Sequence, residues 1–206
     1  LLDDGGTDAF QLRRLGEGFL AVELLEPDGG TTSVSRYPDG WEEGEYAAPD
    51  VLSSAASLPL ADLPLDLLPT YVEAAGGEVQ SLVVQVDHAG LLRVWASIPD
   101  QSVGLLVDGS GRIPTLDIET VDGVRAAVAE LVASYGTAAA AIGSFNDFVH
   151  MDANVEGVDR ALRVVRYAAE GPHSSVVEKG LLADERLFDP TSFDPTPALE
   201  KKPTIV

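Results

Sequence analysis

The sequence contains no cysteine, so it can form neither a disulfide framework nor a thiolate metal site. A chain without thiols fits an oxidising compartment, although many cytoplasmic proteins also lack cysteine. There is no stretch of about 20 apolar residues, the length that a transmembrane helix requires. The chain starts at Leu1 rather than at methionine. This start predicts a trimmed or processed chain, which a signal peptide or membrane anchor could precede.

Positive charge is scarce as well. The 206 residues include 34 aspartates and glutamates but only 13 lysines and arginines, so the formal net charge is −21 and the pI is near 4.2. Such a field repels phosphate backbones and anionic membrane surfaces, and we therefore expect no nucleic-acid partner. The same field attracts cations, divalent ions included, and basic partners.

Familiar catalytic motifs are missing. No phosphate-binding loop, G-x-S-x-G elbow or H-E-x-x-H motif occurs. The letters G-x-G-x-x-A occur at 16–21, but a dinucleotide site needs a helix after them and here a strand pattern follows. Among 34 acidic residues some carboxylate pair always looks suggestive, so such pairs carry no weight without geometry. We expect no catalytic residue, no cofactor and no metal ligand.

What the sequence does contain is a repeated strand pattern. Hydrophobic residues make up 45% of the chain, enough to bury a core without metals or cross-links. Three segments alternate apolar and polar residues at the period of a half-buried strand, and each is followed by a second and a third strand pattern. The leading strands are 19–25, 82–88 and 147–153, the second strands are 32–37, 91–97 and 161–167, and the third strands are 43–47, 103–107 and 175–179.

An acidic link follows each group of strands, at 58–66, 113–122 and 186–194. After the second link, the apolar spacing predicts a helix over 124–135, with Asp122 as N-cap and Gly136 as its end. A shorter helix over 68–75 follows the first link. The aspartates of the repeated FDP and LD motifs are expected to cap or start helices.

These patterns predict an α+β fold of tandem units, each a three-stranded antiparallel meander plus a helix, with the helices packed on one sheet face. The predicted units span about 16–76, 77–136 and 137–206 of one compact repeat protein. The spacing leaves open whether the helix precedes or follows the strands of its unit.

The link LFDPTSFDP at 187–195, the strand LRVVRYAAEG at 162–171 and the strand-and-helix repeat resemble PepSY-like repeat domains. More narrowly, they are similar to uncharacterised actinobacterial extracytoplasmic proteins, often lipoproteins or membrane-anchored ectodomains. The resemblance covers about 19–194 and implies a binding or inhibitory module of the cell envelope, secreted or membrane-anchored. It implies no catalytic residue.

Two acidic patterns invite a metal hypothesis. His150 and Asp152 are two positions apart on a predicted strand, so they share a face, but no second histidine pair supplies further ligands. The run 152–157 starts like a calcium-binding loop, yet its twelfth position is Arg163, where a glutamate is required. Ordinary hairpin residues explain both patterns better.

The second strands of the last two groups carry the strongest candidate for a site. Arg93 and Trp95 alternate with aliphatic residues, as do Arg163 and Tyr167. If the aliphatic residues face the helices, these four side chains form a possible interaction face, because arginine and aromatic residues dominate binding hot spots. A solvated sheet face with cross-strand ion pairs is the simpler alternative.

The function that follows is a non-enzymatic, extracytoplasmic binding or protein-interaction module whose ligand the sequence does not identify. The alternative is a carboxylate- or metal-dependent hydrolase with a cleft between units. A structural spacer is a third possibility. An enzyme would gather histidine, aspartate and arginine at one cleft, whereas a binding module would present a broad face.

Overall fold

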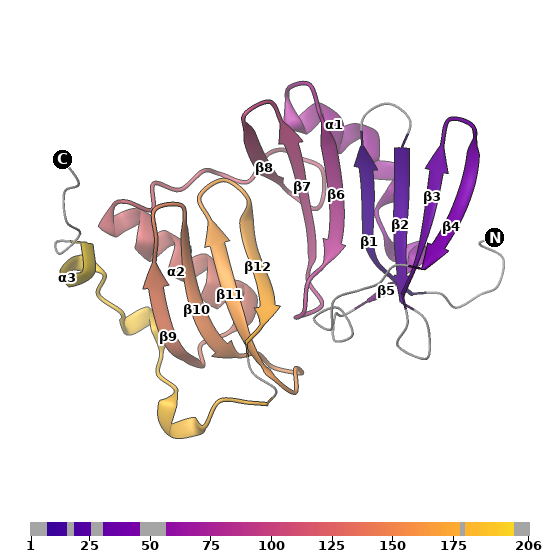
Figure 1. Ribbon diagram of the computed structural model, residues 1–206. Helices are drawn as coiled ribbons and strands as arrows, with labels where there is room; N and C mark the ends of the chain where they lie inside the picture. Colours follow the sequence, from indigo (N-terminus) through magenta and orange to yellow (C-terminus); the bar gives the residue numbers. More distant parts are fainter. Residues whose placement is uncertain (1–7, 16–18, 26–30, 46–56, 178–179, 200–206) are drawn as a thin grey trace. The chain divides into compact units, whose positions relative to one another are not determined.

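The structure of the protein is a computed structural model. It describes residues 8–15, 19–25, 31–45, 57–177 and 180–199 (Figure 1). The chain divides into two compact units, Leu1–Ile113 and Pro114–Val206, here called the first and the second unit. Each unit is α+β, with an antiparallel sheet and helices, as the sequence predicted. No helix within the described ranges is long and apolar enough to cross a membrane.

The described part of the first unit contains an eight-stranded antiparallel sheet. Seven strands lie in the order β4-β3-β2-β1-β6-β7-β8, and β5 pairs with β1. Strand β1 therefore joins two meanders, β2 to β4 and β6 to β8, into one sheet. The strands are β1 Asp8–Leu15, β2 Phe19–Leu25, β3 Thr31–Tyr37, β4 Gly40–Glu45, β5 Leu58–Pro59, β6 Ser81–Val86, β7 Leu92–Ile98 and β8 Gln101–Leu105.

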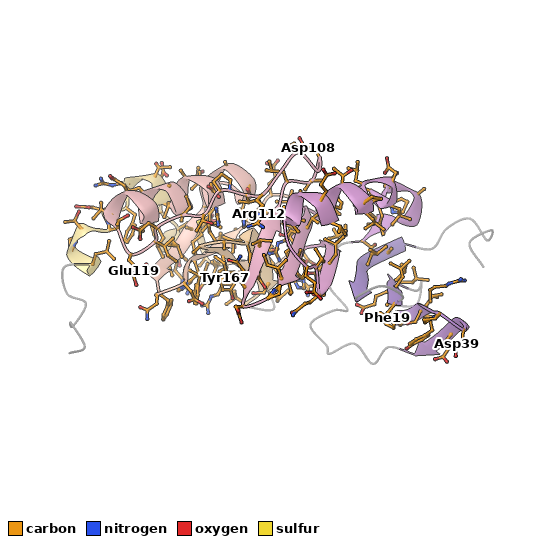
Figure 2. The ribbon with its side chains drawn as sticks, turned by 90° about the horizontal axis from the view of Figure 1, so that it is seen from above. Phe19, Asp39, Asp108, Arg112, Glu119 and Tyr167 are labelled. Atoms are coloured by element: carbon orange, nitrogen blue, oxygen red, sulfur yellow. The ribbon has the colours of Figure 1, made fainter. Side chains whose placement is uncertain are left out.

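One helix closes the core of the first unit. Two 3-10 turns, Leu60–Asp62 and Leu65–Leu67, lead into α1 (Leu68–Ala75), which contacts β7 and β8. Tyr71 of α1 is fully buried among strand residues such as Leu12 and Val94. Arg112, labelled in Figure 2, donates hydrogen bonds to the last carbonyls of α1, where a cation also complements the helix dipole.

The described part of the second unit contains a four-stranded antiparallel sheet in the order β12-β11-β10-β9, with α2 on one face (Figure 1). Apolar residues of α2, among them Val124 and Leu131, are fully buried. The elements are α2 Val121–Tyr135, β9 Ala139–Ser144, β10 Phe148–Asn154, β11 Ala161–Tyr167, β12 Gly171–Val176, the 3-10 turns η4 Asp184–Arg186 and η5 Pro190–Ser192, and α3 Thr196–Leu199.

The start of α2 differs by two residues from the prediction. Thr120, rather than Asp122, is the N-cap, and its hydroxyl accepts a hydrogen bond from the amide of Gly123 at 3.1 Å. Asp122 lies in the first turn, where its negative charge favours the helix dipole. Gly136 ends the helix, as predicted. In the third link, Asp189 caps η5 by accepting from the amide of Thr191.

The division of the chain also differs from the three predicted units at 16–76, 77–136 and 137–206. Helices α1 and α2 pack on the meanders that follow them in the chain. In both cases the helix therefore precedes the strands of its unit. Strand β1 merges the first two meanders into one sheet, and the boundary between compact units falls at Ile113–Pro114, before α2.

The predicted strands are largely confirmed, although most of their bounds shift by a few residues. Strands β2 and β11 have the predicted bounds. Strand β12 begins at Gly171, ahead of the predicted start at 175, and it contains Pro172. An edge strand allows this because proline there need not donate a hydrogen bond. Residues 46–47 and 178–179 of the predicted third strands lie outside the described residues. Strands β1, β5 and β9 were not predicted.

Arg166 of β11 connects the strands of the second unit to α2. Its side chain has 0% exposure. The guanidinium donates to the carboxylate of Glu130 on α2 and to the carbonyls of Pro114, Tyr167 and Ala168. A buried charge is tolerated only when its donors are satisfied, and here carbonyls and a carboxylate surround it.

Candidate functional site

The candidate site is the sheet face of the second unit that lies opposite α2, here called the outer face. Alternate residues of β10 separate the two faces. Val149 and Met151 are fully buried on the α2 side, whereas Phe148, His150 and Asp152 are only partly buried. The α2 side is thus the core of the unit, and the outer face carries side chains that solvent reaches.

Strand register arranges the outer face in three rows that cross the sheet from β9 to β12. The first row contains four positions with three aromatic rings, the second has two histidines, and the third has an ion pair. From β9 to β12, the rows are Phe145, Phe148, Tyr167 and Gly171; Gly143, His150, Val165 and His173; and Ala141, Asp152, Arg163 and Ser175.

Five rings of these rows form a continuous aromatic cluster. Phe145 stacks on Phe148 at 4.7 Å between centroids and on His150 at 5.6 Å. Phe148 contacts Tyr167 at 5.4 Å, and Tyr167 stacks on His173 at 5.0 Å with nearly parallel planes. Tyr167 is labelled in Figure 2. Phe145 is 52% exposed, so this cluster is not a second closed core.

A glycine on β9 makes room for one of these rings. A Cβ at Gly143 would lie far inside van der Waals contact of Cε1 of His150. The imidazole therefore lies against the backbone of β9, beneath the stacked ring of Phe145. A residue with any side chain at position 143 would move His150 out of the cluster.

The environment of His150 disfavours its charged form. Burial is the main cause that lowers the pKa of His150 below its ordinary value, and the nearby guanidinium of Arg163 adds to the effect. Asp152 opposes this shift. The Nδ1 atom is buried and has no hydrogen-bond partner within the described residues. At neutral pH, His150 is thus a neutral, largely apolar ring.

The third row is electrically balanced. Arg163 donates from Nε and Nη2 to the two carboxylate oxygens of Asp152 at 2.7 and 2.9 Å, a bidentate pair. The hydrogen bond to Asp152 raises the pKa of Arg163 above its ordinary value. Ser175 lies on the other side of Arg163 in the ladder.

The structure divides the four predicted interaction residues between the two units. Arg163 and Tyr167 lie together on the outer face of the second unit. Arg93 and Trp95 lie on β7 of the first unit, on the face opposite α1, with the guanidinium carbon 5.0 Å from the indole centroid. Trp95 is half-buried and does not lie beneath α1, since its neighbours Val94 and Ala96 supply the core on that side.

The patterns considered for metals have structural explanations. His150 and Asp152 share a face, as their spacing predicted, but both carboxylate oxygens of Asp152 bond Arg163. Arg163 is the residue that occupies the twelfth position of the calcium-like pattern. The side chain of Asn154 exchanges hydrogen bonds with the backbone of Leu182. Among the described residues, no group of three or more histidines and carboxylates could hold a metal ion.

Three outer-face aromatics, Phe145, Phe148 and His173, were not predicted as site residues. Phe148 could have been found from the sequence, because the alternation of 147–153 places it on the same face as His150. Placing it opposite Tyr167 requires the register of β10 and β11. Phe145 lies in the turn before β10, and His173 lies ahead of the predicted strand at 175–179, so periodicity did not place either ring.

Comparison with models of protein families, with curated proteins and with solved structures gave no match.

Proposed function

We propose that this protein is a non-enzymatic binding or protein-interaction module that takes its partner on the outer face of the second unit. The observation that carries the proposal is the continuous cluster of Phe145, Phe148, His150, Tyr167 and His173 on a face that α2 leaves uncovered. Aromatic side chains offer a large contact area at a small cost in conformational entropy, and they dominate binding hot spots.

The arrangement of the outer face suits docking of a broad surface or an extended segment. Its ring cluster lies beside a polar row with a partly exposed guanidinium, whose Nη1 atom is not used by Asp152. An apolar centre with a polar margin is typical of interfaces that bind specifically. The Arg93 and Trp95 pair of the first unit is a smaller candidate surface of the same chemistry.

A hydrolase receives less support from the same residues. Histidine, aspartate and arginine do gather on the outer face. However, both carboxylate oxygens of Asp152 accept hydrogen bonds from the guanidinium of Arg163, so this carboxylate is already engaged in an ion pair. The buried Nδ1 of His150 has no carboxylate to orient the ring, as a general base would require.

The compartment belongs to the proposal as well. We place the module outside the cytoplasm, secreted or tethered to the envelope, on the absence of cysteine and on the resemblance to PepSY-like repeat proteins. Gene-level sequence upstream of Leu1 tests this placement, because a lipobox cysteine or a single membrane span is the expected finding.

Arrays of peptides and oligosaccharides test the binding role. We expect the wild-type protein to bind a subset of probes, the double variant F145S/Y167S to lose them, and L181S to keep them. Leu181 is a matched control because it is an apolar residue with 57% exposure that lies away from the aromatic cluster. The next residue, Leu182, accepts a hydrogen bond from Asn154, which lies at the other end of β10 from Phe148. Binding that F145S/Y167S leaves unchanged, or turnover of ester and glycoside substrates that this variant abolishes, contradicts the proposal.

A further inference from the structure

Acidic residues of the second unit lie in the turns at both ends of its sheet. The ion pair of Asp152 and Arg163 contributes no net charge to the third row. Two other carboxylates lie at the opposite end of the sheet, next to the aromatic first row. Asp147 belongs to the turn between β9 and β10, and Glu170 belongs to the turn between β11 and β12.

Backbone bonding holds these two turns side by side. The amide of Ala168 donates to the carbonyl of Asp147 at 2.9 Å, one step beyond the pair of Phe148 and Tyr167 in the ladder. Asp147 is exposed and Glu170 is partly buried. Neither carboxylate forms an ion pair with any described residue. The aromatic row therefore ends at two uncompensated negative charges.

The charge of the whole chain has the same sign. A net charge of −21 attracts cationic partners over distances of about a Debye length, ~8 Å at physiological ionic strength. Rings at the margin of the cluster can also accept a cation near their faces, and Phe145 is the most exposed of them. The net charge of the chain, the exposed rings and the two carboxylates at the end of the aromatic row thus all favour a cationic partner.

We propose that the partner is a basic polypeptide segment, in which apolar side chains lie on the aromatic cluster and lysine or arginine side chains pair with Asp147 and Glu170. This inference rests on the proposed function, since it names the partner of the same face. A second copy of this strongly acidic chain is disfavoured as the occupant, because like charges would meet. A neutral oligosaccharide would leave the two carboxylates without a counter-ion.

Four probes test the assignment on the full chain by calorimetric titration. Three are capped heptapeptides, Gly-X-Gly-Leu-Gly-X-Gly with X as Arg, Gln or Glu, and the fourth is cellotetraose. We expect the Arg peptide to bind at least about tenfold more tightly than the other three probes, a difference of about 1.4 kcal/mol. Its affinity should fall as NaCl rises from about 20 to 300 mM.

Two double variants separate a local site from the general field of the protein. D147N/E170Q and D184N/E185Q remove the same number of negative charges. Asp184 and Glu185 lie in η4, shortly before Phe188, which pairs with Ala139 at the end of β9 away from the aromatic row. We expect D147N/E170Q to weaken binding of the Arg peptide about fivefold or more, and D184N/E185Q to change it less than twofold. Circular dichroism checks that both variants fold.

Every other outcome rejects the basic polypeptide as the partner, and each outcome points to a different explanation. Equal weakening by the two double variants shows attraction by net charge alone. Binding of the Gln peptide or of cellotetraose that F145S/Y167S abolishes rejects the basic partner but retains the proposed function. Concentration-dependent dimers that F145S/Y167S abolishes identify a second copy as the occupant. If none of the four probes binds, the basic partner is rejected, and the array experiment decides the binding role separately.

Discussion

At the scale of single residues, the second unit depends on a buried cation. Arg166 has no exposed side-chain surface, and its guanidinium bonds carbonyls from three residues as well as Glu130. Removing it would leave buried acceptors without a donor and a void between β11 and α2. Loss of a buried side chain that satisfies several acceptors lowers the free energy of unfolding more than loss of a surface ion pair does.

We predict that R166A lowers the free energy of unfolding by about 3 kcal/mol, and that R125A lowers it by less than about 0.5 kcal/mol. Arg125 is the matched control because its side chain is 55% exposed and, among the described residues, pairs only with the exposed Asp122 and Asp194. Urea denaturation followed by circular dichroism measures both. Similar losses in the two variants would show that Arg166 does not hold β11 to α2.

His150 makes stability depend on pH in a defined direction. Its pKa in the folded protein lies below the ordinary value of 6.5, mainly because of burial. The unfolded chain therefore binds a proton more readily, so the stability from the neutral ring is present above pH 6.5 and is lost as the pH falls towards the folded pKa. Acid also relieves repulsion in this chain, so only a comparison with a variant isolates the effect.

We predict that the difference in unfolding free energy between the wild type and H150Q shrinks as the pH falls from about 7.5 to 5, because glutamine does not titrate. Thermal or urea unfolding at several pH values measures this difference. A difference that is constant, or that grows on acidification, would mean that the ring is not buried in its neutral form.

At the scale of elements, Gly123 of α2 is a position where helix propensity alone predicts the wrong sign for the effect of a substitution on stability. Replacing a helical glycine by alanine ordinarily stabilises a helix by about 1 kcal/mol. At Gly123, however, the added Cβ would overlap the backbone carbonyl of Asp117 in the segment that leads into the helix. The close approach explains why glycine occupies the first turn of α2.

We predict that G123A destabilises the protein by about 1 to 3 kcal/mol, opposite in sign to the propensity effect. A129G, at an exposed position of the same helix, should cost about 1 kcal/mol through propensity alone. Thermal unfolding by circular dichroism compares the two. A stabilised G123A variant would refute the close packing of 117 on the helix start.

The elements that the sequence predicted well are those with a clear period. Strands β2 and β11 have the predicted bounds, and the apolar spacing of α2 predicted that helix except for its first turn. Strand β9 begins with three alanines, which favour a helix locally, and it becomes a strand because it pairs with β10. A strand that forms because of its pairing partner need not show the alternation of apolar and polar residues by which strands are recognised in a sequence.

The candidate site shows the same limit. Alternation in β11 was enough to place Arg163 and Tyr167 on one face. The partner of Arg163 is Asp152, and this pairing depends on the register of β10 against β11. The ring of Phe145 joins the cluster through a turn, and His150 fits only because β9 places Gly143 opposite it. Periodicity defines faces, whereas register and turns bring the site together.

At the scale of the whole molecule, self-repulsion opposes folding. The net charge is −21, and both units contain more acidic than basic residues. The compact state holds these charges closer together than the unfolded chain does, and salt screens them beyond about 8 to 10 Å.

We therefore predict that the melting temperature rises by several degrees when NaCl increases from about 10 to 200 mM, because screening of repulsion outweighs screening of the few surface ion pairs. Scanning calorimetry in a buffer of constant pH measures the change. A melting temperature that stays constant or falls would show that favourable ion pairs outweigh the repulsion.

We propose that a partner binds on the outer face of the second unit. The most direct measurement is a map of amide chemical-shift changes in the isotope-labelled protein during titration with the Arg heptapeptide. We predict that the largest changes gather on β10, β11 and the turns at Asp147 and Glu170, around Phe148 and Tyr167. Changes that gather around Arg93 and Trp95 in the first unit, or that spread evenly over acidic loops, would contradict the claim.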